Sequence, residues 1–463
     1  MKRIAIIGGG ISGLSAAFRL QTKSRQGAPL EYVIFEAGAR FGGVIQTEQV
    51  GGCVLEAGPD SFLTEKAWAL DLCRELGLED QLISSNDSER VTYLLVAGRL
   101  VPIPEGLMFM VPTKPGPTLF SPLFSWSTKL RILREWFYRP SPESRDVTVA
   151  AFLERHYGRE MVDRVADPLL AGVYGSSADE LSVRSVLPRF LEMEEKYGSL
   201  GKAMVAARKR TARNPQAKPL FTSLRQGMQQ LIDALLARIP APARQLNTPV
   251  DCVEVESGKW LVAGRGRTQE FDAVILAVPA YAASHLLAGL PALREELNGI
   301  TYSSSVTAVF AFDRTVRTAL PPGFGFLVPR AENRRMVATT FVHNKFPHRA
   351  PPEVALIRCF LGGSRDQTIL ESSDADIENL CLGELKAILG VTRQPRIARV
   401  HRSKKAMAQY APGHADRVLR IKQAISDLRG FALAGNAYGG IGVPDCIRAG
   451  SEAAAKVVAD LGL

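Results

Sequence analysis

Four glycines occupy a six-residue window near the start of the chain, in "IAIIGGGISGLSAAFRL" (residues 4–20). Gly8 would start a tight turn, Gly10 would let a ligand approach the backbone, and Gly13 would let a helix pack closely on the preceding strand. A helix that begins at such a turn presents unpaired N–H groups and a partial positive charge, and both suit a pyrophosphate. The spacing therefore indicates a dinucleotide phosphate site.

The elements around these glycines have the order that a dinucleotide site needs. Residues 4–7 form a short apolar run, mostly β-branched, which predicts a buried strand. Residues 14–20 continue with helical spacing. A second strand over residues 31–35 ends at Glu36, about 20 residues on, where an acid binds the ribose. An isolated glycine pattern is a weak signal, but strand, turn, helix and acid together favour the binding site.

A second pair of glycines distinguishes between the dinucleotides. "AGARFGGVIQT" follows Glu36 and contains Arg40, Gly42 and Gly43, and "LEAGPDSF" places Gly58 in another turn. A nicotinamide site does not need this second pair. Extended FAD folds use it because a second backbone loop covers the pyrophosphate, so FAD is the expected cofactor. Two ordinary surface turns are the alternative.

The composition is that of an ordinary globular protein, with 22% charged and 46% apolar residues. At 463 residues the chain is too long for one compact core, so two or three substructures are expected. A net charge of +10 favours anionic partners: nucleic acid, anionic lipid or a carboxylate-rich substrate. The sequence has no zinc-finger spacing or nucleic-acid motif, so no nucleic-acid partner is expected.

Cysteine and histidine usage narrows the class of protein further. The six cysteines are scattered without a C-x-x-C pair, which fits a reducing cytosol rather than a disulfide framework. The sequence enters a strand at once, so we expect no signal peptide and a cytoplasmic location. None of the six histidines has metal-ligand spacing, so no metal is expected.

Three stretches raise the question of membrane contact. Residues 100–145 combine prolines, bulky apolar residues and cations, a pattern typical of a segment in a membrane interface; a helical subdomain packed on its own core is the alternative. Residues 202–218 are basic and predict a solvated helix face and loop. Residues 273–293 are uncharged and long enough to span a bilayer, but prolines interrupt them, so a core strand and a helix are expected.

The later segments return to the strand–helix pattern of the first. The predicted fold class is α/β and α+β, with a discontinuous Rossmann-type FAD-binding domain. This domain is expected to comprise residues 1–88, 219–285 and 425–463. A helical, membrane-associating domain (89–218) and a substrate-binding domain (286–424) are inserted between these segments.

The last glycine turn, in "AGNAYGGIGVPDCIRAG", also precedes a helix. A strand ends at Gly435, and Pro444 opens the helix, a position that suits proline. The free N–H groups of residues 441–443 would point at one partner. In a flavoprotein that partner is the N1/C2=O edge of the isoalloxazine, where a helix dipole stabilises the reduced flavin. An ordinary helix cap is the alternative.

Taken together with the earlier motifs, this turn completes a pattern that resembles the amine-oxidase-like FAD superfamily. More narrowly, the chain resembles the protoporphyrinogen oxidases of haem synthesis. The resemblance covers essentially the whole chain and rests on "GGGISGL", "RFGGVIQT", "GPDSF", "LLAGVYGSSADELSVRS", "GFGFLVP" and "LAGNAYGGIGVPDCIRAG". It implies FAD bound by Gly8, Gly9, Gly10, Ile11, Ser12, Gly13, Glu36, Ala37, Arg40, Gly43, Val44, Gly58, Pro59, Asp60, Ser61, Val250, Asn436, Ile441, Gly442 and Val443.

The resemblance also implies a substrate pocket. Arg90 would face a propionate, while Gly172, Phe324, Leu327 and Phe360 would line an apolar slot. A porphyrinogen is a large apolar ring with carboxylates on one edge, so a bidentate Arg and aromatic faces suit it. From its residue type alone, Arg90 is a strand-edge surface cation.

The sequence departs from the family pattern at one position that bears on the choice of substrate. Asp60 stands where some mitochondrial relatives have a cation, which removes one propionate partner. Bacterial relatives of this type include enzymes that act on coproporphyrinogen III, which carries four propionates instead of two.

The implied chemistry is a six-electron oxidation of a porphyrinogen, with oxygen or another acceptor regenerating the flavin and no catalytic side chain required. Protoporphyrinogen IX ranks first as substrate, because the apolar segment suits the less soluble ring, and coproporphyrinogen III is the alternative. An amine oxidase or carotenoid desaturase of the same fold, and a non-enzymatic FAD-fold escort protein, are further alternatives. A membrane surface on the inner face of the cell membrane and a second copy of the chain are candidate partners.

Overall fold

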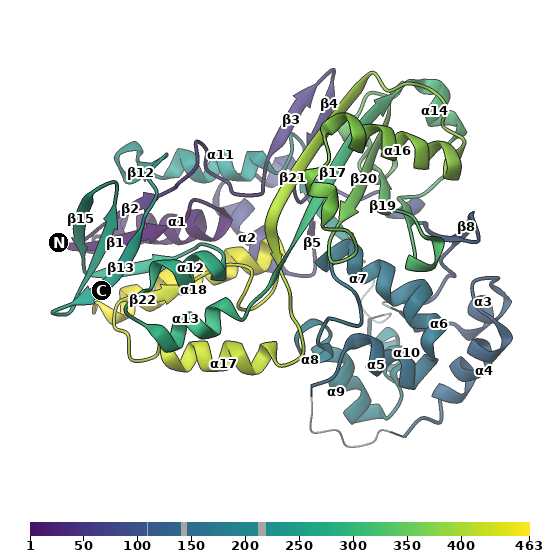
Figure 1. The fold of residues 1–463 in the computed structure, drawn as a ribbon, viewed down its shortest axis with the longest axis horizontal. Coiled ribbons are helices and arrows are strands. Elements are labelled where there is room, and N and C mark those ends of the chain that lie inside the picture. Colours follow the sequence, from purple (N-terminus) through teal and green to yellow (C-terminus); the bar gives the residue numbers. More distant parts are fainter. Residues whose placement is uncertain (109, 140–145, 212–218) are drawn as a thin grey trace.

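Three stretches far apart in sequence form one parallel sheet. The computed structural model describes residues 1–108, 110–139, 146–211 and 219–463 (Figure 1). The five-stranded sheet has the order β12-β2-β1-β16-β22, all parallel. Its strands are β1 (Lys2–Ile7), β2 (Leu30–Phe35), β12 (Arg244–Gln245), β16 (Ala273–Leu276) and β22 (Phe431–Leu433). The expected Rossmann-type domain assembled from separated segments is confirmed.

Alternate residues of β1 explain why this sheet is buried on both faces. Ile4 and Ile6 belong to a core shared with helices α1 (Ile11–Arg25), α2 (Ala67–Glu75), α11 (Gln229–Arg238) and α18 (Val443–Asp460). Ala5 and Ile7 belong to a second core with the meander β13 (Cys252–Glu256), β14 (Lys259–Gly264) and β15 (Arg267–Phe271). A strand with covered faces reads as a continuous apolar run, as residues 4–7 do.

A seven-stranded sheet forms the second body of the fold (Figure 1). Its order is β21-β17-β20-β19-β18-β7-β8, and α16 (Asp374–Leu389) packs on one face. The strands are β7 (Thr92–Val96), β8 (Arg99–Pro102), β17 (Tyr302–Phe312), β18 (Gly325–Leu327), β19 (Met336–Phe341), β20 (Ala355–Gly362) and β21 (Ile397–Ala408). The short helices α14 (Arg314–Ala319) and α15 (Val342–Lys345) connect them.

Residues 92–102 belong to this sheet, whereas the expected boundary grouped them with the helical segment. β7 pairs with β18 in parallel, with Gly325 opposite Thr92 and Leu327 opposite Leu94, and β8 pairs with β7. Alternating residues in β7 supply both faces, because Leu94 joins one core and Leu95 the other. The partner strand lies more than 200 residues away, so no local pattern reveals the pairing.

Two small sheets complete the strands near the five-stranded sheet. The hairpin β3 (Thr47–Val50) and β4 (Cys53–Glu56) extends from the first domain, and β11 (Phe221–Leu224) pairs with β5 (Phe62–Leu63) and β6 (Leu82–Ser84). The uncharged stretch 273–293 folds as β16, then α12 (Ala280–Leu286) and α13 (Pro291–Asn298), which confirms the expected strand and helix. Among the described residues, no helix is both long and apolar enough to cross a membrane.

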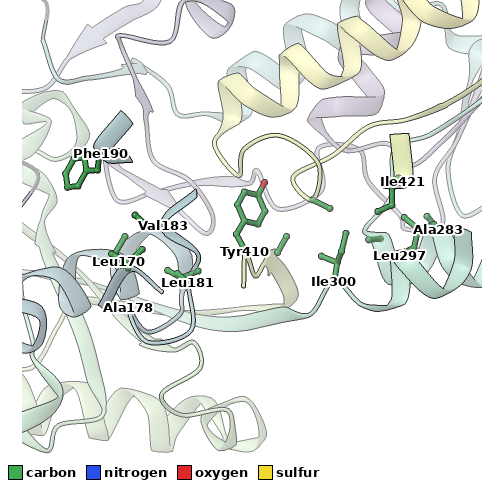
Figure 2. Packing of buried hydrophobic residues seen from close by; sticks show 14 of the residues in the cluster. Leu170, Ala178, Leu181, Val183, Phe190, Ala283, Leu297, Ile300, Tyr410 and Ile421 are labelled. Atoms are coloured by element: carbon green, nitrogen blue, oxygen red, sulfur yellow. The ribbon is translucent and has the colours of Figure 1, made fainter. Parts of the chain in front are cut away.

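The helices between residues 110 and 211 share their core with the rest of the chain. They are α3 (Pro115–Phe120), α4 (Trp126–Glu135), α5 (Val149–Tyr157), α6 (Arg159–Met161), α7 (Asp167–Tyr174), α8 (Val183–Val186), α9 (Pro188–Tyr197) and α10 (Leu200–Thr211). Figure 2 shows that core running from Leu170 and Phe190 past Tyr410 to Ile300 and to Ile421 of α17 (His414–Ala424). Residue 109, residues 140–145 of the apolar segment and residues 212–218 of the basic stretch lie outside the described residues.

A buried histidine joins four of these helices. His156 of α5 bonds Glu135 of α4 through Nδ1 (3.1 Å) and Glu194 of α9 through Nε2 (3.2 Å). The Glu135 carboxylate also accepts hydrogen bonds from the N–H groups of Leu200 and Gly201 at the start of α10. Burial opposes the charged form of His156, but the two carboxylates outweigh it and raise its pKa above the ordinary value.

We expect His156→Gln to loosen these helices in a pH-dependent manner. A raised pKa in the folded state means that the stabilisation is fully present below the ordinary histidine pKa of about 6.5 and is lost as pH rises through the raised value. Removing one partner of a buried charge pair costs about 3 kcal/mol. Hydrogen exchange of α5 and α9, compared with wild type, should therefore accelerate more at pH 6 than at pH 9. Equal acceleration at both pH values would contradict the charged state of His156.

Candidate active site

The first glycine loop has the geometry of a phosphate site. A Cβ on Gly8, whose φ is 107°, would lie 2.4 Å from the carbonyl oxygen of Ala277, and a Cβ on Gly13 would lie 1.9 Å from that of Gly8. Packing of α1 onto β1 therefore demands both glycines. A Cβ on Gly10 would meet nothing within 4 Å, so this residue faces open space at the start of α1. The turn fits a pyrophosphate at the helix N-terminus.

Glu36 lies at the carboxyl end of β2, beside this loop. Its carboxylate accepts hydrogen bonds from the N–H groups of Gly9 and Gly38, both at 2.7 Å. Ala37 is exposed next to it. The N–H of Thr248 donates to the Glu36 carbonyl oxygen (2.8 Å), which brings the connection between β12 and β13, with Val250 in it, close to Glu36. The acid thus orders the glycine turn, and its contact with the ribose stays a prediction.

The second glycine pair packs directly on the first loop. The Gly42 N–H donates to the Gly9 carbonyl oxygen (2.8 Å), and a Cβ on Gly43 would lie 3.3 Å from the Cα of Gly10. The guanidinium of Arg40 donates to the carbonyl oxygens of Ile45 and Gly43, so it holds this loop in place. Burial lowers the pKa of Arg40 from its ordinary value. The structure brings the two predicted loops together, as an FAD site requires.

The turn at residues 58–61 closes over the same loop. A Cβ on Gly58 would lie 1.9 Å from the carbonyl oxygen of Val44, so only glycine fits there. The Asp60 side chain in this turn is bound to other residues of the protein. Its carboxylate contacts Lys345 at 3.0 Å and accepts a hydrogen bond from Ser61 at 2.6 Å. Burial opposes ionisation of Asp60, but Lys345 and Arg358 outweigh it and hold its pKa below the ordinary value.

The start of α18 is fixed by a buried carboxylate. Gly442 is the N-cap residue, and its N–H donates to Asp445 (3.2 Å), which also pairs with Lys66 (2.5 Å). The Gly442 N–H is therefore bonded to Asp445 and is not free, which corrects that part of the prediction. The N–H groups of Ile441 and Val443 lie at the start of this 18-residue helix, whose N-terminus carries a partial positive charge that suits the predicted flavin edge.

Tyr410 ties the glycine turn to the second sheet. Its hydroxyl donates to the carbonyl oxygen of Asn436 (2.7 Å) and accepts from the N–H of Gly440 (2.8 Å). Burial raises the pKa of Tyr410, so the hydroxyl stays protonated and keeps both roles. The side chain of Asn436 donates to the carbonyl oxygen of Ala406 at the end of β21 (2.8 Å). Sequence reasoning missed Tyr410 because nothing near it in the sequence marks its partners.

Three of the five predicted substrate residues lie at one face of the seven-stranded sheet: Gly172, Leu327 and Phe360. The register places Leu327, Ala338, Phe360, Thr307 and His401 directly opposite one another on β18, β19, β20, β17 and β21. Residues paired in this way point to the same face. Gly172 of α7 lies above this face, because a Cβ on it would be 3.8 Å from the Leu327 side chain.

Arg90 and Phe324 come shortly before β7 and β18, which pair in parallel. The Phe324 N–H donates to the carbonyl oxygen of Val91 (2.7 Å), the residue after Arg90. Arg90 is 48% exposed, and its guanidinium lies 3.9 Å from Asp87. A half-exposed, weakly paired guanidinium can receive a carboxylate.

His401 and Thr307 also lie on this face of the sheet, and the sequence suggested neither as a site residue. The Nε2 atom of His401 is buried and has no hydrogen-bond partner among the described residues. Burial lowers the pKa of His401, so the ring is neutral at physiological pH. The sequence shows a histidine at this position, but only the pairing of β17 with β21 places it in the same row as Phe360.

The comparisons with known proteins agree with this geometry. The family model of flavin containing amine oxidoreductases matches residues 11–458. The chain is 33% identical to the "Coproporphyrinogen III oxidase" of Bacillus subtilis (strain 168), over 98% of this chain and 97% of the relative. It is 27% identical to the "Protoporphyrinogen oxidase 2, chloroplastic/mitochondrial" of Arabidopsis thaliana, over 99% and 94%.

Solved structures show the same fold. A crystal structure of an Exiguobacterium sp. 255-15 protein, provisionally named protoporphyrinogen oxidase, superposes with a TM-score of 0.88 at 28% identity, covering 100% of this chain and 99% of that one. Cyclohexylamine oxidase from Brevibacterium oxydans has a TM-score of 0.73 at 19% identity, over 100% of both chains, a likeness of fold alone.

The fold and the paired glycine loops therefore define an FAD-dependent oxidoreductase. Within that class, the chain belongs to the flavin containing amine oxidoreductase family and to its protoporphyrinogen oxidase branch.

We expect Glu36→Ala to weaken FAD binding by about 1–3 kcal/mol, because the carboxylate orders the glycine turn and faces the ribose position. Titration of the flavin-free protein with FAD, followed by flavin fluorescence, measures the change. Glu31→Ala is the matched control, since Glu31 lies at the other end of β2 and pairs with Arg3 on the surface. A Glu36→Ala variant with the wild-type dissociation constant would remove Glu36 from the site.

Proposed function

We propose that this enzyme oxidises coproporphyrinogen III to coproporphyrin III. The observation that carries the proposal is the set of relatives with that name. Those of Bacillus subtilis, Staphylococcus aureus and Propionibacterium freudenreichii are 33%, 29% and 32% identical and cover 98–99% of this chain. The proposal reverses the order that the sequence suggested, in which protoporphyrinogen IX came first.

The packing of part of the apolar segment weakens the reason for the earlier order. Protoporphyrinogen IX, the less soluble ring, ranked first because the bulky apolar residues of 100–145 were expected to contact a membrane. Leu123, Phe124 and Ile132 are instead 0%, 3% and 2% exposed and belong to the core. A net charge of +10 also suits four propionates better than two.

The chain's own contribution is binding and orientation. The row from Leu327 to Phe360 offers an apolar floor for the macrocycle, Gly172 leaves room above it, and Arg90 pairs with a propionate. FAD, when bound, supplies the two-electron acceptor, and oxygen or another acceptor regenerates it. Three rounds remove six electrons and six hydrogens. The ring nitrogens release their own protons, so positioning rather than a nucleophilic side chain provides the catalysis.

The substrate proposal is tested by anaerobic reduction of the flavin with each porphyrinogen. Wild type should be reduced faster by coproporphyrinogen III than by protoporphyrinogen IX. Arg90→Ala should lower kcat/KM by a factor of about 30 to 1,000, since a carboxylate is left unpaired in a partly desolvated site. Arg99→Ala, at the start of the nearby strand β8, is the control. A wild-type preference for protoporphyrinogen IX would overturn the substrate, and an unchanged kcat/KM in Arg90→Ala would remove Arg90.

We also propose that the exposed apolar side chains on α4 and directly beside it bind an anionic membrane surface. Phe120, Trp126 and Phe137 are 90%, 80% and 84% exposed. Trp126, Leu130 and Leu133 follow one another at helical spacing, and the exposed Arg131 and Arg134 lie on the same helix. Apolar side chains flanked by cations are typical of interfacial helices.

Sedimentation with anionic vesicles tests this proposal. Replacing Phe120, Trp126 and Phe137 with Ser should move the protein from the vesicle pellet to the supernatant, because each buried aromatic contributes about 1.5–3 kcal/mol. Phe124 is left intact, since it is a core residue. Serine at Val255 and Leu419, two exposed apolar residues elsewhere, is the matched control. Failure of wild type to sediment with these vesicles would refute the proposal.

A further inference from the structure

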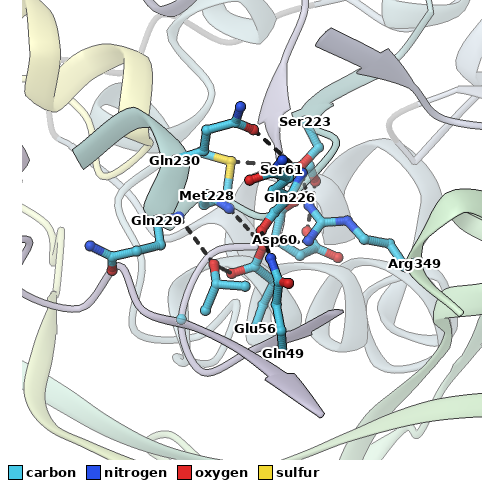
Figure 3. A network of polar contacts seen from close by, with 12 residues as sticks. Gln49, Glu56, Asp60, Ser61, Ser223, Gln226, Met228, Gln229, Gln230 and Arg349 are labelled. Atoms are coloured by element: carbon cyan, nitrogen blue, oxygen red, sulfur yellow. Dashed lines mark hydrogen bonds and ion pairs between the residues drawn. The ribbon is translucent and has the colours of Figure 1, made fainter. Parts of the chain in front are cut away.

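Five buried charged side chains lie between the 58–61 turn and the seven-stranded sheet, and Figure 3 shows part of this network. Glu56 and Asp60 belong to the first domain, at the end of β4 and in the turn that follows it. Lys345, Arg349 and Arg358 come from α15, the turn beyond it and β20. All five side chains are at most 17% exposed.

Asp60 is held by the sheet side of this network. Its two carboxylate oxygens lie 3.0 and 3.2 Å from the Lys345 ammonium, which also lies 3.3 Å from the Ser61 hydroxyl. The same ammonium lies over the rings of Phe221 and Phe346, at 4.5 and 5.1 Å from their centroids. Lys345 is therefore fixed on every side and can act as a rigid anchor.

Two further contacts reach the backbone of the turn. The Arg358 guanidinium donates to the carbonyl oxygen of Gly58 and lies 3.9 Å from Asp60. Arg349 pairs with Glu56 (2.7 Å) and donates to the Ser223 hydroxyl (2.6 Å), which in turn donates to the carbonyl oxygen of Asp60 (2.6 Å). Residues from the body of the seven-stranded sheet thus hold the turn directly at the Gly58 carbonyl oxygen and the Asp60 carboxylate, and through Ser223 of β11 at the Asp60 carbonyl oxygen.

The charges in this network do not cancel, because three cations face two carboxylates. Loss of the Asp60 charge would leave the three cations with Glu56 alone. Loss of the Lys345 charge would leave two cations with two carboxylates. An unpaired buried charge costs far more than the pair contributes, so Asp60 variants should be the more severe.

We propose that Lys345 and Arg358 are positioning residues for the cofactor: they set the backbone of residues 58–61, so that FAD is held in its working position only when the seven-stranded sheet is docked. The inference rests on the predicted contact between residues 58–61 and FAD. It follows from geometry, since Gly58 packs on Val44 and Gly43 packs on Gly10. A displacement of the turn would pass along these backbone contacts to the phosphate loop.

The test uses the full chain and measures FAD dissociation together with the visible circular dichroism of the bound flavin. Lys345→Met should weaken FAD binding by about tenfold, and Asp60→Asn by more, both with an altered flavin spectrum. The double variant should recover much of the affinity lost in Asp60→Asn, because the uncompensated cation is removed with it. Lys345→Arg, which keeps the charge, should bind FAD within about twofold of wild type. Arg335→Met is the control, since Arg335 lies directly before β19 of the same sheet and pairs with Asp366 instead of Asp60.

FAD affinity and a flavin spectrum like those of wild type in both Lys345→Met and Asp60→Asn would overturn the proposal. Strictly additive losses in the double variant would overturn the coupling between Asp60 and Lys345. Should Asp60→Asn fail to fold, the contrast between Lys345→Met and Lys345→Arg decides the question alone. None of these measurements uses a porphyrinogen, so they stand whether or not the substrate assignment holds.

Discussion

The contact of α1 with α18 is the one on which the rest of the flavin site depends. A Cβ on Gly450 would lie 2.1 Å from the carbonyl oxygen of Ser12, so the two helices touch backbone to backbone. That contact sets two helix N-termini, one from each end of the chain, at the carboxyl edge of the same parallel sheet. The partial positive charges there are fixed before any ligand arrives, which is what an anionic cofactor needs.

The second sheet is joined to this frame by buried charges. Hydrophobic side chains of similar volume often hold two bodies together at least as well, because desolvation offsets much of the attraction in a buried ion pair. Ion pairs differ in requiring one exact geometry. Asp60, Lys345 and Arg358 lie where a small sliding of the sheet would misplace the 58–61 turn, so specificity of docking is the better explanation for charges at this position.

Much of the flavin site could be predicted because its signals are local. Gly8, Gly13 and Glu36 follow one another within a single strand–turn–helix–strand unit, and the final glycine turn precedes its own helix. Tyr410, Lys345 and Arg358 escaped prediction because each acts on a turn far away in the sequence; Lys345 and Asp60 are 285 residues apart. Their partners depend on how the two sheets dock, and no pattern of neighbouring residues encodes that.

The apolar segment illustrates a second limit. Phe120, Phe124 and Trp126 look alike in the sequence, yet Phe124 is in the core while the other two are exposed. Hydrophobicity predicts that such side chains avoid water. It does not predict whether the protein itself or another surface covers them, because that depends on how α3, α4 and the connection between them pack on the core.

A glycine at which a Cβ would fit without a clash can leave room for a ligand, although many surface glycines also have open space around them. Gly13 and Gly58 are demanded by the protein's own packing, since a Cβ on either would collide with a carbonyl oxygen. Gly10 and Gly172 are not: a Cβ would meet nothing at the first and only ordinary contact at the second. Glycine within a helix costs about 1 kcal/mol relative to alanine, so Gly172 in α7 needs another reason. Space above Leu327 for a flat, bulky substrate is a sufficient one. The same argument applied to Gly10 gives space for the predicted pyrophosphate at the start of α1.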